Sequence, residues 1–286
     1  MTLLETNNGK INIIKYSSQT PSDKIVLCIH GFCCDARIFD YLGNALANNG
    51  FDVYSIDLPG HGKSYGEKGD LDFDECLESI HDVIAKLKGT SKLFILAHSM
   101  GCTYALWYAH TFKKSIDGLI LFAPYVRIPH VKKRSEIEPS NIRFLYFLLR
   151  KMLTPKTRLL ATKELPNFLK VGGPEIEQML NDKSLNFYYS YRYIVNVLAL
   201  RNASISALSD VEVPMFILHG KKDRNVFSEV GVQFCNLVKS VDKKIDVLDC
   251  DHWFNHCVFY SQDDHRYSEE SRMKIIDLVK DWISSH

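Results

Sequence analysis

The chain has 286 residues, of which 46% are hydrophobic, and its 35 Lys and Arg against 34 Asp and Glu leave a net charge of +1. That length and hydrophobic content are enough to bury one substantial core. No apolar run approaches the roughly 18 residues of a membrane-spanning helix, and residues 1–10 lack the basic start and apolar stretch of a signal peptide, so we expect a single cytoplasmic unit.

Strands and helices alternate in the first part of the chain. Residues 24–29 and 52–57 form β-rich runs, and apolar residues recur with a helical period from Phe73 to Leu87. The segment 57–64, D-L-P-G-H-G-K-S, is predicted to be a structural turn that closes the second strand.

The next apolar run, residues 92–98, stops abruptly at Ser99, which Met100 and Gly101 follow. A serine at the tip of a sharp strand-to-helix turn stands clear of its neighbours, so its hydroxyl can reach a carbonyl carbon above the sheet. We therefore predict that Ser99 is a nucleophile and that residues 100–112 form the helix behind it. The alternative is an ordinary strand end with a helix-capping serine.

Residues 125–208, which we call the insertion, contain no readable core strand. Residues 125–170 carry eleven Lys or Arg against three Glu, a local charge of +8, so the rest of the chain sums to −7. Within this stretch, residues 141–153 read N-I-R-F-L-Y-F-L-L-R-K-M-L, an apolar helix with basic flanks. Such a helix fits an anionic membrane interface, although a solvated face with its apolar side on the core is an equal alternative.

A carboxylate follows the next predicted strand. Residues 213–219 are apolar and open into a loop that carries Asp223. The preceding core strand, residues 116–122, runs instead into Ala123, Pro124 and Tyr125 and offers no acid. We predict that Asp223 is the acid of a catalytic triad, because enzymes with a serine on such a strand-to-helix turn place the acid between the serine and the histidine in the chain.

The last predicted strand, residues 244–248, runs into a loop that carries His252, the predicted base. His219 lies at the end of the strand before the acid loop, and His98 is adjacent to the nucleophile. His256 is the strongest rival, one turn further along the same loop. Helices are predicted over residues 229–238 and 268–283, the second capped by Ser268.

This order of elements predicts an α/β fold with a mostly parallel sheet, helices on both faces, and the site at the carboxyl ends of the strands. Residues 1–124 and 209–286 would form the core, and residues 125–208 a mainly helical cap over the site.

The motifs H-G-F at residues 30–32, D-L-P-G-H-G-K-S, A-H-S-M-G at 97–101 and H-G-K-K-D-R-N-V at 219–226 together resemble the monoacylglycerol lipase and lysophospholipase branch of the α/β-hydrolases. The match covers nearly the whole chain in order. One departure is Cys102, where the family often has a second glycine, and we expect it to affect helix packing more than chemistry.

In this fold we expect the backbone N–H groups of Phe32 and Met100 to form an oxyanion hole, and the His30 side chain to have a structural role. The resemblance implies a fold in which the cap builds an acyl pocket. We expect apolar and aromatic side chains of the insertion to line it: Phe144, Leu145, Phe147, Leu148, Phe187, Tyr188 and Tyr189.

The predicted function is a serine hydrolase of monoacylglycerols, lysophospholipids or similar esters, acting through Ser99, His252 and Asp223 without metal or organic cofactor. Relatives include thioesterases and C–C bond hydrolases, and a non-catalytic binding protein or receptor on the same fold is the alternative from another class. A nucleic-acid partner is not expected, because no recognition motif accompanies the basic charge. The eight cysteines show no C-x-x-C spacing, so we expect neither a zinc site nor a disulfide scaffold.

Overall fold

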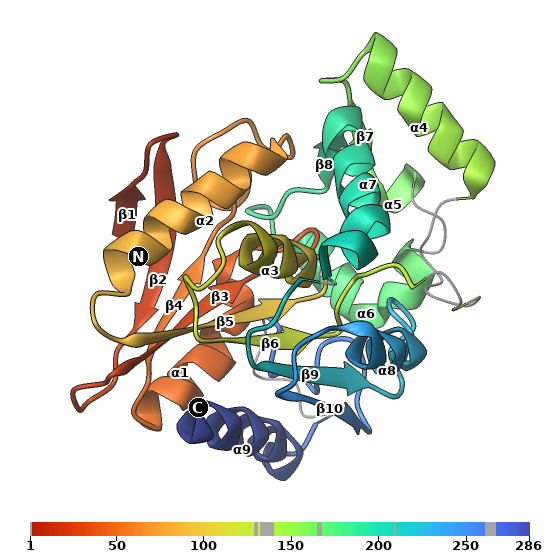
Figure 1. The fold of residues 1–286 in the computed structure, drawn as a ribbon. Helices are drawn as coiled ribbons and strands as arrows, with labels where there is room; N and C mark the ends of the chain where they lie inside the picture. Colours follow the sequence, from red (N-terminus) through yellow and green to blue (C-terminus); the bar gives the residue numbers. More distant parts are fainter. Residues whose placement is uncertain (1, 129–130, 132–139, 165–167, 209, 261–266) are drawn as a thin grey trace.

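The computed structural model describes residues 2–128, 131, 140–164, 168–208, 210–260 and 267–286. Their centre is an eight-stranded sheet in the order β1-β2-β4-β3-β5-β6-β9-β10 (Figure 1). The strands from β4 to β10 run parallel, whereas β2 is antiparallel to both β1 and β4. The strands are β1 Thr2–Glu5, β2 Lys10–Tyr16, β3 Lys24–Ile29, β4 Asp52–Ile56, β5 Lys92–His98, β6 Gly118–Phe122, β9 Met215–Gly220 and β10 Lys243–Leu248.

The middle of the sheet is buried on both faces. Every residue of β5 after Lys92 is buried, and all residues of β6 and β9 are buried. A strand covered on both sides needs a continuous apolar run rather than an alternating one, which is what these segments contain. The carboxyl ends of these three strands therefore form one fixed edge on which a site can be built.

Helices cover the two faces of the sheet. Helices α1 and α9 lie on one face, and α2 and α3 on the other (Figure 1). Trp282 of α9 packs against Phe94 and Phe216, with ring centroids 5.9 and 6.0 Å apart, and so ties the C-terminal helix to β5 and β9. The helices of the core are α1 Asp40–Asn48, α2 Phe73–Leu87, α3 Met100–Thr111, α8 Ser228–Leu237 and α9 Glu269–Ser285, with a short 3₁₀ helix at Ala36–Phe39.

Helix boundaries follow local chemistry. Asp72 caps α2 by accepting hydrogen bonds from the amides of Asp74 and Glu75. Ser268 accepts a hydrogen bond from the amide of Ser271 and caps α9. The predicted helices and core strands agree with the structure to within about two residues at their ends, as expected where the apolar period is clear.

The insertion leaves the core after β6 and returns before β9. Its elements are α4 Asn141–Leu153, β7 Arg158–Leu160, α5 Ala161–Glu164, α6 Phe168–Asn181, β8 Tyr188–Ser190 and α7 Tyr191–Leu208, and β7 pairs with β8 in a small antiparallel sheet. Helix α7 packs against α3 on one side and α4 on the other. None of the helices in the described part of the chain has the length and apolar character needed to cross a bilayer.

An ion pair between a buried aspartate and a partly exposed arginine joins the insertion to the core. Arg192 at the start of α7 donates from Nη2 to Asp70 Oδ2 at 2.7 Å and from Nε to Oδ1 at 3.1 Å. The Ser190 hydroxyl donates to the same carboxylate at 2.5 Å. The hydrogen bonds of Ser190 and Arg192 to Asp70 together fix the direction in which α7 leaves the small sheet.

Candidate active site

Ser99 lies at a strained junction between β5 and α3. Its backbone has φ 53° and ψ −117°, in the left-handed half of the map that a residue with a Cβ adopts only under constraint. The Ser99 amide donates to Phe122 O at 2.8 Å, which holds the turn against β6. A Cβ on Gly101 would stand only 2.4 Å from Ile29 O, so glycine is needed there for α3 to approach β3. These constraints keep the serine at the tip of the turn.

Cys102 follows this turn and lies wholly inside it. Its thiol donates to the carbonyl oxygens of Ala97 at 3.2 Å and Phe122 at 3.3 Å. The Cys102 side chain, which is larger than the glycine often found at this position in the family, therefore packs between β5 and β6. All eight cysteines of the chain are buried and have free thiols.

Asp223 and His252 form a buried hydrogen-bonded pair. His252 Nδ1 donates to Asp223 Oδ2 at 2.7 Å, while Oδ1 accepts from the amides of Asn225 at 2.8 Å and Val226 at 2.9 Å. Because the carboxylate only accepts, the proton of the neutral ring lies on Nδ1 and Nε2 keeps its lone pair. A Cβ on Gly220 would stand 2.4 Å from Asp251 O, so this glycine lets the acid and histidine loops meet.

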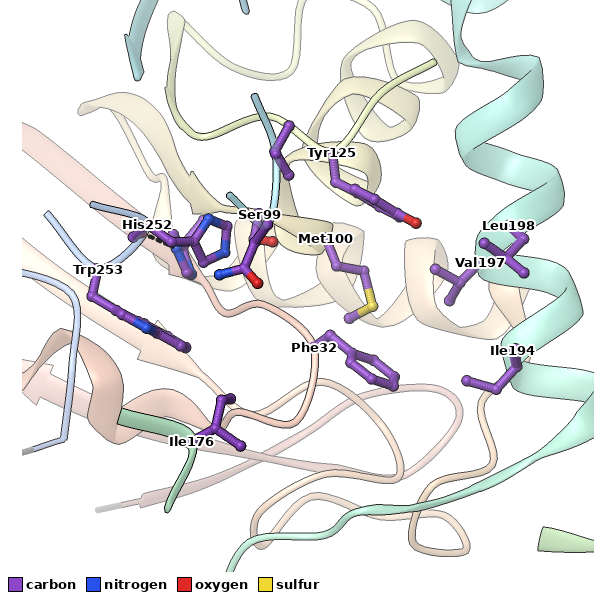
Figure 2. A pocket seen from close by; sticks show the side chains of 13 residues that line it. Phe32, Ser99, Met100, Tyr125, Ile176, Ile194, Val197, Leu198, His252 and Trp253 are labelled. Carbon is purple, nitrogen blue, oxygen red and sulfur yellow. Dashed lines mark hydrogen bonds between the residues drawn. The ribbon is translucent and has the colours of Figure 1, made fainter. Parts of the chain in front are cut away.

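Ser99 and His252 line the same cavity, and Figure 2 shows the serine side chain beside the imidazole ring. The structure thus brings Ser99, His252 and Asp223 together at the carboxyl edge of the sheet, from the ends of three strands. A serine, a histidine with a free ring nitrogen and an acid that fixes the histidine tautomer can activate a hydroxyl for attack on a carbonyl.

His98, the last residue of β5, connects this strand to the loop that carries His252. Its Nε2 donates to the backbone oxygen of His252 at 3.0 Å. Burial lowers the pKa of His98 well below the ordinary value, so its ring is neutral at neutral pH. In the sequence, His98 was only a weaker candidate for the base than His252. Its hydrogen bond to His252 could not be predicted, because the two residues are 154 positions apart in the chain.

Phe32 and Met100 also line this cavity. A Cβ on Gly31 would stand 3.2 Å from Ser99 Cβ, so the loop that carries Phe32 lies directly against Ser99. Met100 is the first residue of α3, where backbone N–H groups lack an acceptor within the helix. Both residues thus lie beside Ser99, and their amides remain the predicted donors to a developing oxyanion.

The side chains around this loop are structural. His30 Nε2 accepts a hydrogen bond from the Leu58 amide at 3.1 Å, and burial lowers the pKa of His30. Asp57 accepts from Ala36 N at 2.7 Å, Lys63 N at 2.7 Å and Asn12 Nδ2 at 2.8 Å. The turn at residues 57–64 therefore closes the end of β4 and joins it to β2 and the loop after β3.

Aromatic residues of the insertion support the same loop. The Phe32 ring stacks on Tyr189 with centroids 4.5 Å apart, and Tyr189 stacks on Tyr193 at 4.9 Å. The buried Tyr193 hydroxyl donates to Met100 Sδ at 3.0 Å. The insertion thus contacts the side chains of both Phe32 and Met100, which line the cavity beside Ser99.

The cavity has a mainly apolar wall. Its α7 side consists of Ile194, Val197 and Leu198, and its other side includes Ile176 and Trp253 (Figure 2). Val226 also lines the cavity. Tyr125 and Asn225 complete the lining together with His98. The Tyr125 hydroxyl accepts a hydrogen bond from Arg201 Nη1 at 3.0 Å.

The predicted lining residues of the insertion are not among these wall residues. Phe147 is buried between α4 and α7, and the centroid of its ring lies 6.0 Å from that of Tyr191. Phe144 is partly buried and Phe187 is buried, both outside the cavity lining. The side chains of Leu145, Leu148 and Tyr188 are exposed. They do not line this cavity because α4 packs on the far side of α7 (Figure 1), so that α7 itself forms the wall, and their part in substrate binding stays a prediction. Tyr189 does not line the cavity either and lies behind Phe32.

His256, the rival base, contacts the insertion rather than the acid. Its Nε2 lies 3.2 Å from Glu175 Oε1 of α6, and the ring is fully buried. Among the described residues, no group of three or more His, Cys, Asp or Glu side chains is placed to hold a metal ion.

Comparison with known proteins places this geometry in a family. The family model described as serine aminopeptidase, S33 matches residues 20–259. The AB hydrolase superfamily protein YisY of Bacillus subtilis is 28% identical over 208 residues, which cover 70% of this chain and 74% of that protein. A putative monoglyceride lipase of Schizosaccharomyces pombe is 24% identical over 281 residues, 91% of this chain and 67% of that one.

Solved structures show the same α/β-hydrolase fold. A soluble variant of monoglyceride lipase from Saccharomyces cerevisiae, crystallised with a substrate analog, superposes with a TM-score of 0.77. The two chains are 20% identical, and the match covers 100% of this chain and 94% of that one.

Proposed function

Since the chain belongs to the serine aminopeptidase S33 family of α/β-hydrolases, we propose that it is a serine hydrolase of carboxylic esters of single-chain lipids, of the monoacylglycerol or lysophospholipid type. The observation that carries the proposal is the 2.7 Å hydrogen bond between Asp223 and His252, which leaves His252 Nε2 available on the side where Ser99 lines the cavity.

In the proposed mechanism the Ser99 hydroxyl attacks the ester carbonyl while His252 Nε2 takes its proton. The amides of Phe32 and Met100 stabilise the negative oxygen of the tetrahedral intermediate. Its collapse breaks the bond to the alcohol oxygen, which receives the proton from His252. Water then attacks the acyl-enzyme with the same histidine as base, and the free acid leaves.

The apolar wall supports a lipid acyl group. Ile194, Val197 and Leu198 lie together on α7 and are buried. No Asp, Glu, Lys or Arg is among the described residues that line the cavity. Burial of each acyl methylene against such a wall contributes about 0.8 kcal/mol. Two relatives named as monoglyceride lipases support the same substrate class.

Contact with an anionic membrane through α4 is part of the proposal. Phe147 fixes α4 to α7, and the opposite face exposes Ile142 at 83%, Met152 at 76% and Leu153 at 76%. Leu145 and Leu149 extend this apolar stripe, and Arg143, Arg150 and Lys151 lie within the same helix. An apolar stripe with basic neighbours binds interfaces that carry negative charge. Lys132, Lys133 and Arg134 lie outside the described residues.

The test combines labelling with a substrate series. A tagged fluorophosphonate should label one serine, and kcat/KM for p-nitrophenyl esters should rise about fourfold per added methylene until the wall is filled. Hydrolysis of monoacylglycerols should follow the same trend. Binding of a lipid without labelling or turnover would instead favour a non-catalytic binding protein, and preference for thioesters over matched oxygen esters would favour a thioesterase.

A further inference from the structure

The cavity has two sides relative to Ser99. Figure 2 shows His252 and Trp253 on one side of the serine and Ile194, Val197 and Leu198 on the other. In ester cleavage His252 must pass its proton to the oxygen of the departing alcohol. The alcohol part of the substrate therefore lies on the side of His252, and the acyl part lies toward α7.

Asn225 lies on the alcohol side. Its amide donates to Asp223 Oδ1 at 2.8 Å, and Asp223 Oδ2 accepts from His252 at 2.7 Å. The backbone of Asn225 is thus fixed through one carboxylate to the histidine that protonates the alcohol. The residue is half-buried and lines the cavity together with Val226, Ile176 and Trp253.

The side-chain amide of Asn225 has no hydrogen-bond partner among the described residues, and most of the side chains that line the cavity with it are apolar or aromatic. A primary amide offers two donors and one acceptor. In a mainly apolar cavity such a group gains most from a polar substituent of the ligand and loses when an alkyl group displaces its water.

We propose that Asn225 is a specificity-determining residue that hydrogen-bonds a hydroxyl group on the departing alcohol. The site then prefers esters of polyhydric alcohols, such as glycerol, over esters of simple alkanols with the same acyl chain. This inference rests on the proposed ester hydrolysis at Ser99 and adds the chemistry of the alcohol to it.

The experiment measures kcat/KM for octanoylglycerol and for propyl octanoate, which share an acyl chain and differ in the hydroxyls. Wild-type protein should favour the glycerol ester, and Asn225→Leu should reduce that ratio by three- to tenfold. Val197→Ala is the matched control: it alters the acyl wall that both substrates use, so both kcat/KM values should change by the same factor.

A second variant and a folding check keep the outcome interpretable. Asn225→Ser retains a donor and an acceptor in a smaller side chain and should keep part of the preference, and thermal unfolding shows whether each variant is folded. An unchanged ratio in folded Asn225→Leu, or no wild-type preference while both esters are cleaved, overturns the role of Asn225 alone. A wild-type protein inactive on both esters overturns the proposed function and this inference with it.

Discussion

His256 Nε2 lies 3.2 Å from Glu175 Oε1, so the loop that carries His252 is bonded directly to helix α6 of the insertion. Phe254, Asn255 and His256 all have φ between 53° and 62°, a run of left-handed residues that costs roughly 1–2 kcal/mol each. The turn directs His252 toward Asp223 and His256 toward the insertion. Contact with the insertion therefore helps to hold the histidine loop in its strained form.

Replacement of the two histidines should give different results. His252→Ala is expected to reduce kcat/KM by several orders of magnitude, because the proton acceptor is lost. His256→Ala should lower the free energy of unfolding by about 3 kcal/mol, since it leaves Glu175 buried without this partner, and should affect turnover less. Steady-state kinetics and urea unfolding of both variants test this. A larger kinetic loss in His256→Ala would reverse the assignment.

Asp223→Asn should also be severe. An asparagine at this position can present its NH₂ to His252 and favour the wrong tautomer, so kcat should fall by about 10⁴. Kinetics of the purified variant measure the loss, and circular dichroism checks the fold. Retention of more than a tenth of wild-type kcat would show that another acid serves His252.

Ser99→Ala should abolish fluorophosphonate labelling and lower kcat by several orders of magnitude. The smaller side chain removes the hydroxyl without disturbing the turn, which backbone contacts and Gly101 maintain. Mass spectrometry of the labelled peptide identifies the modified residue. Labelling of a different serine would remove Ser99 from the mechanism.

The exposed stripe of α4 should determine membrane binding. Ile142→Ser combined with Met152→Ser and Leu153→Ser should weaken binding to anionic vesicles while sparing turnover of a short soluble ester. Val241→Ser is the matched control, because Val241 is 99% exposed but lies away from α4. Vesicle sedimentation with and without salt reports both the apolar and the ionic contributions. Equal binding to neutral and anionic vesicles at any salt concentration would assign no role to the basic residues.

Stability should decrease on mild acidification because several histidines are buried in the neutral form. Burial lowers the pKa of His30, His98 and His219, and it lowers that of His61 to about 3. In the unfolded chain these rings protonate near pH 6.5, so stability is full above that pH and is lost as pH falls toward the folded pKa.

Each such histidine contributes a slope of up to about 1.4 kcal/mol per pH unit below pH 6.5. Urea unfolding at pH 7.5, 6 and 5 measures the sum, and His61→Gln should remove one histidine's share of the slope. A free energy of unfolding that stays constant from pH 7.5 to pH 5 would contradict the neutral state of these rings.

The core could be predicted because its signals are local. The amphipathic period of α2 and the unbroken apolar runs of β5 and β9 each identify an element without knowledge of its neighbours. The site follows from the same elements, since Ser99, Asp223 and His252 each come after a strand and parallel strands end at one edge. Strands β1 and β2 were not predicted, because they are short or at the margin of the sheet and carry polar residues.

The cavity wall could not be predicted from local pattern. Helix α7 is apolar on several sides, since it packs against both α3 and α4, and no period distinguishes the side that faces Ser99. Its orientation depends on distant contacts such as Arg192 with Asp70 and Trp107 Nε1 with Leu200 O at 3.3 Å. The basic and aromatic residues of α4 form a clear pattern in the sequence, but α4 is separated from the cavity by α7.

Strands β6 and β9 are hydrogen-bonded neighbours, although some ninety residues separate them along the chain. The sheet itself therefore fixes the points at which the chain leaves β6 and enters β9, whatever the length of chain between them. Residues 125–208 lie between two strands whose order and pairing the sheet already determines. A segment that replaced residues 125–208 would have to supply new partners for Asp70, Met100 and His256, in addition to the contacts that Phe32 and Trp107 make with this segment.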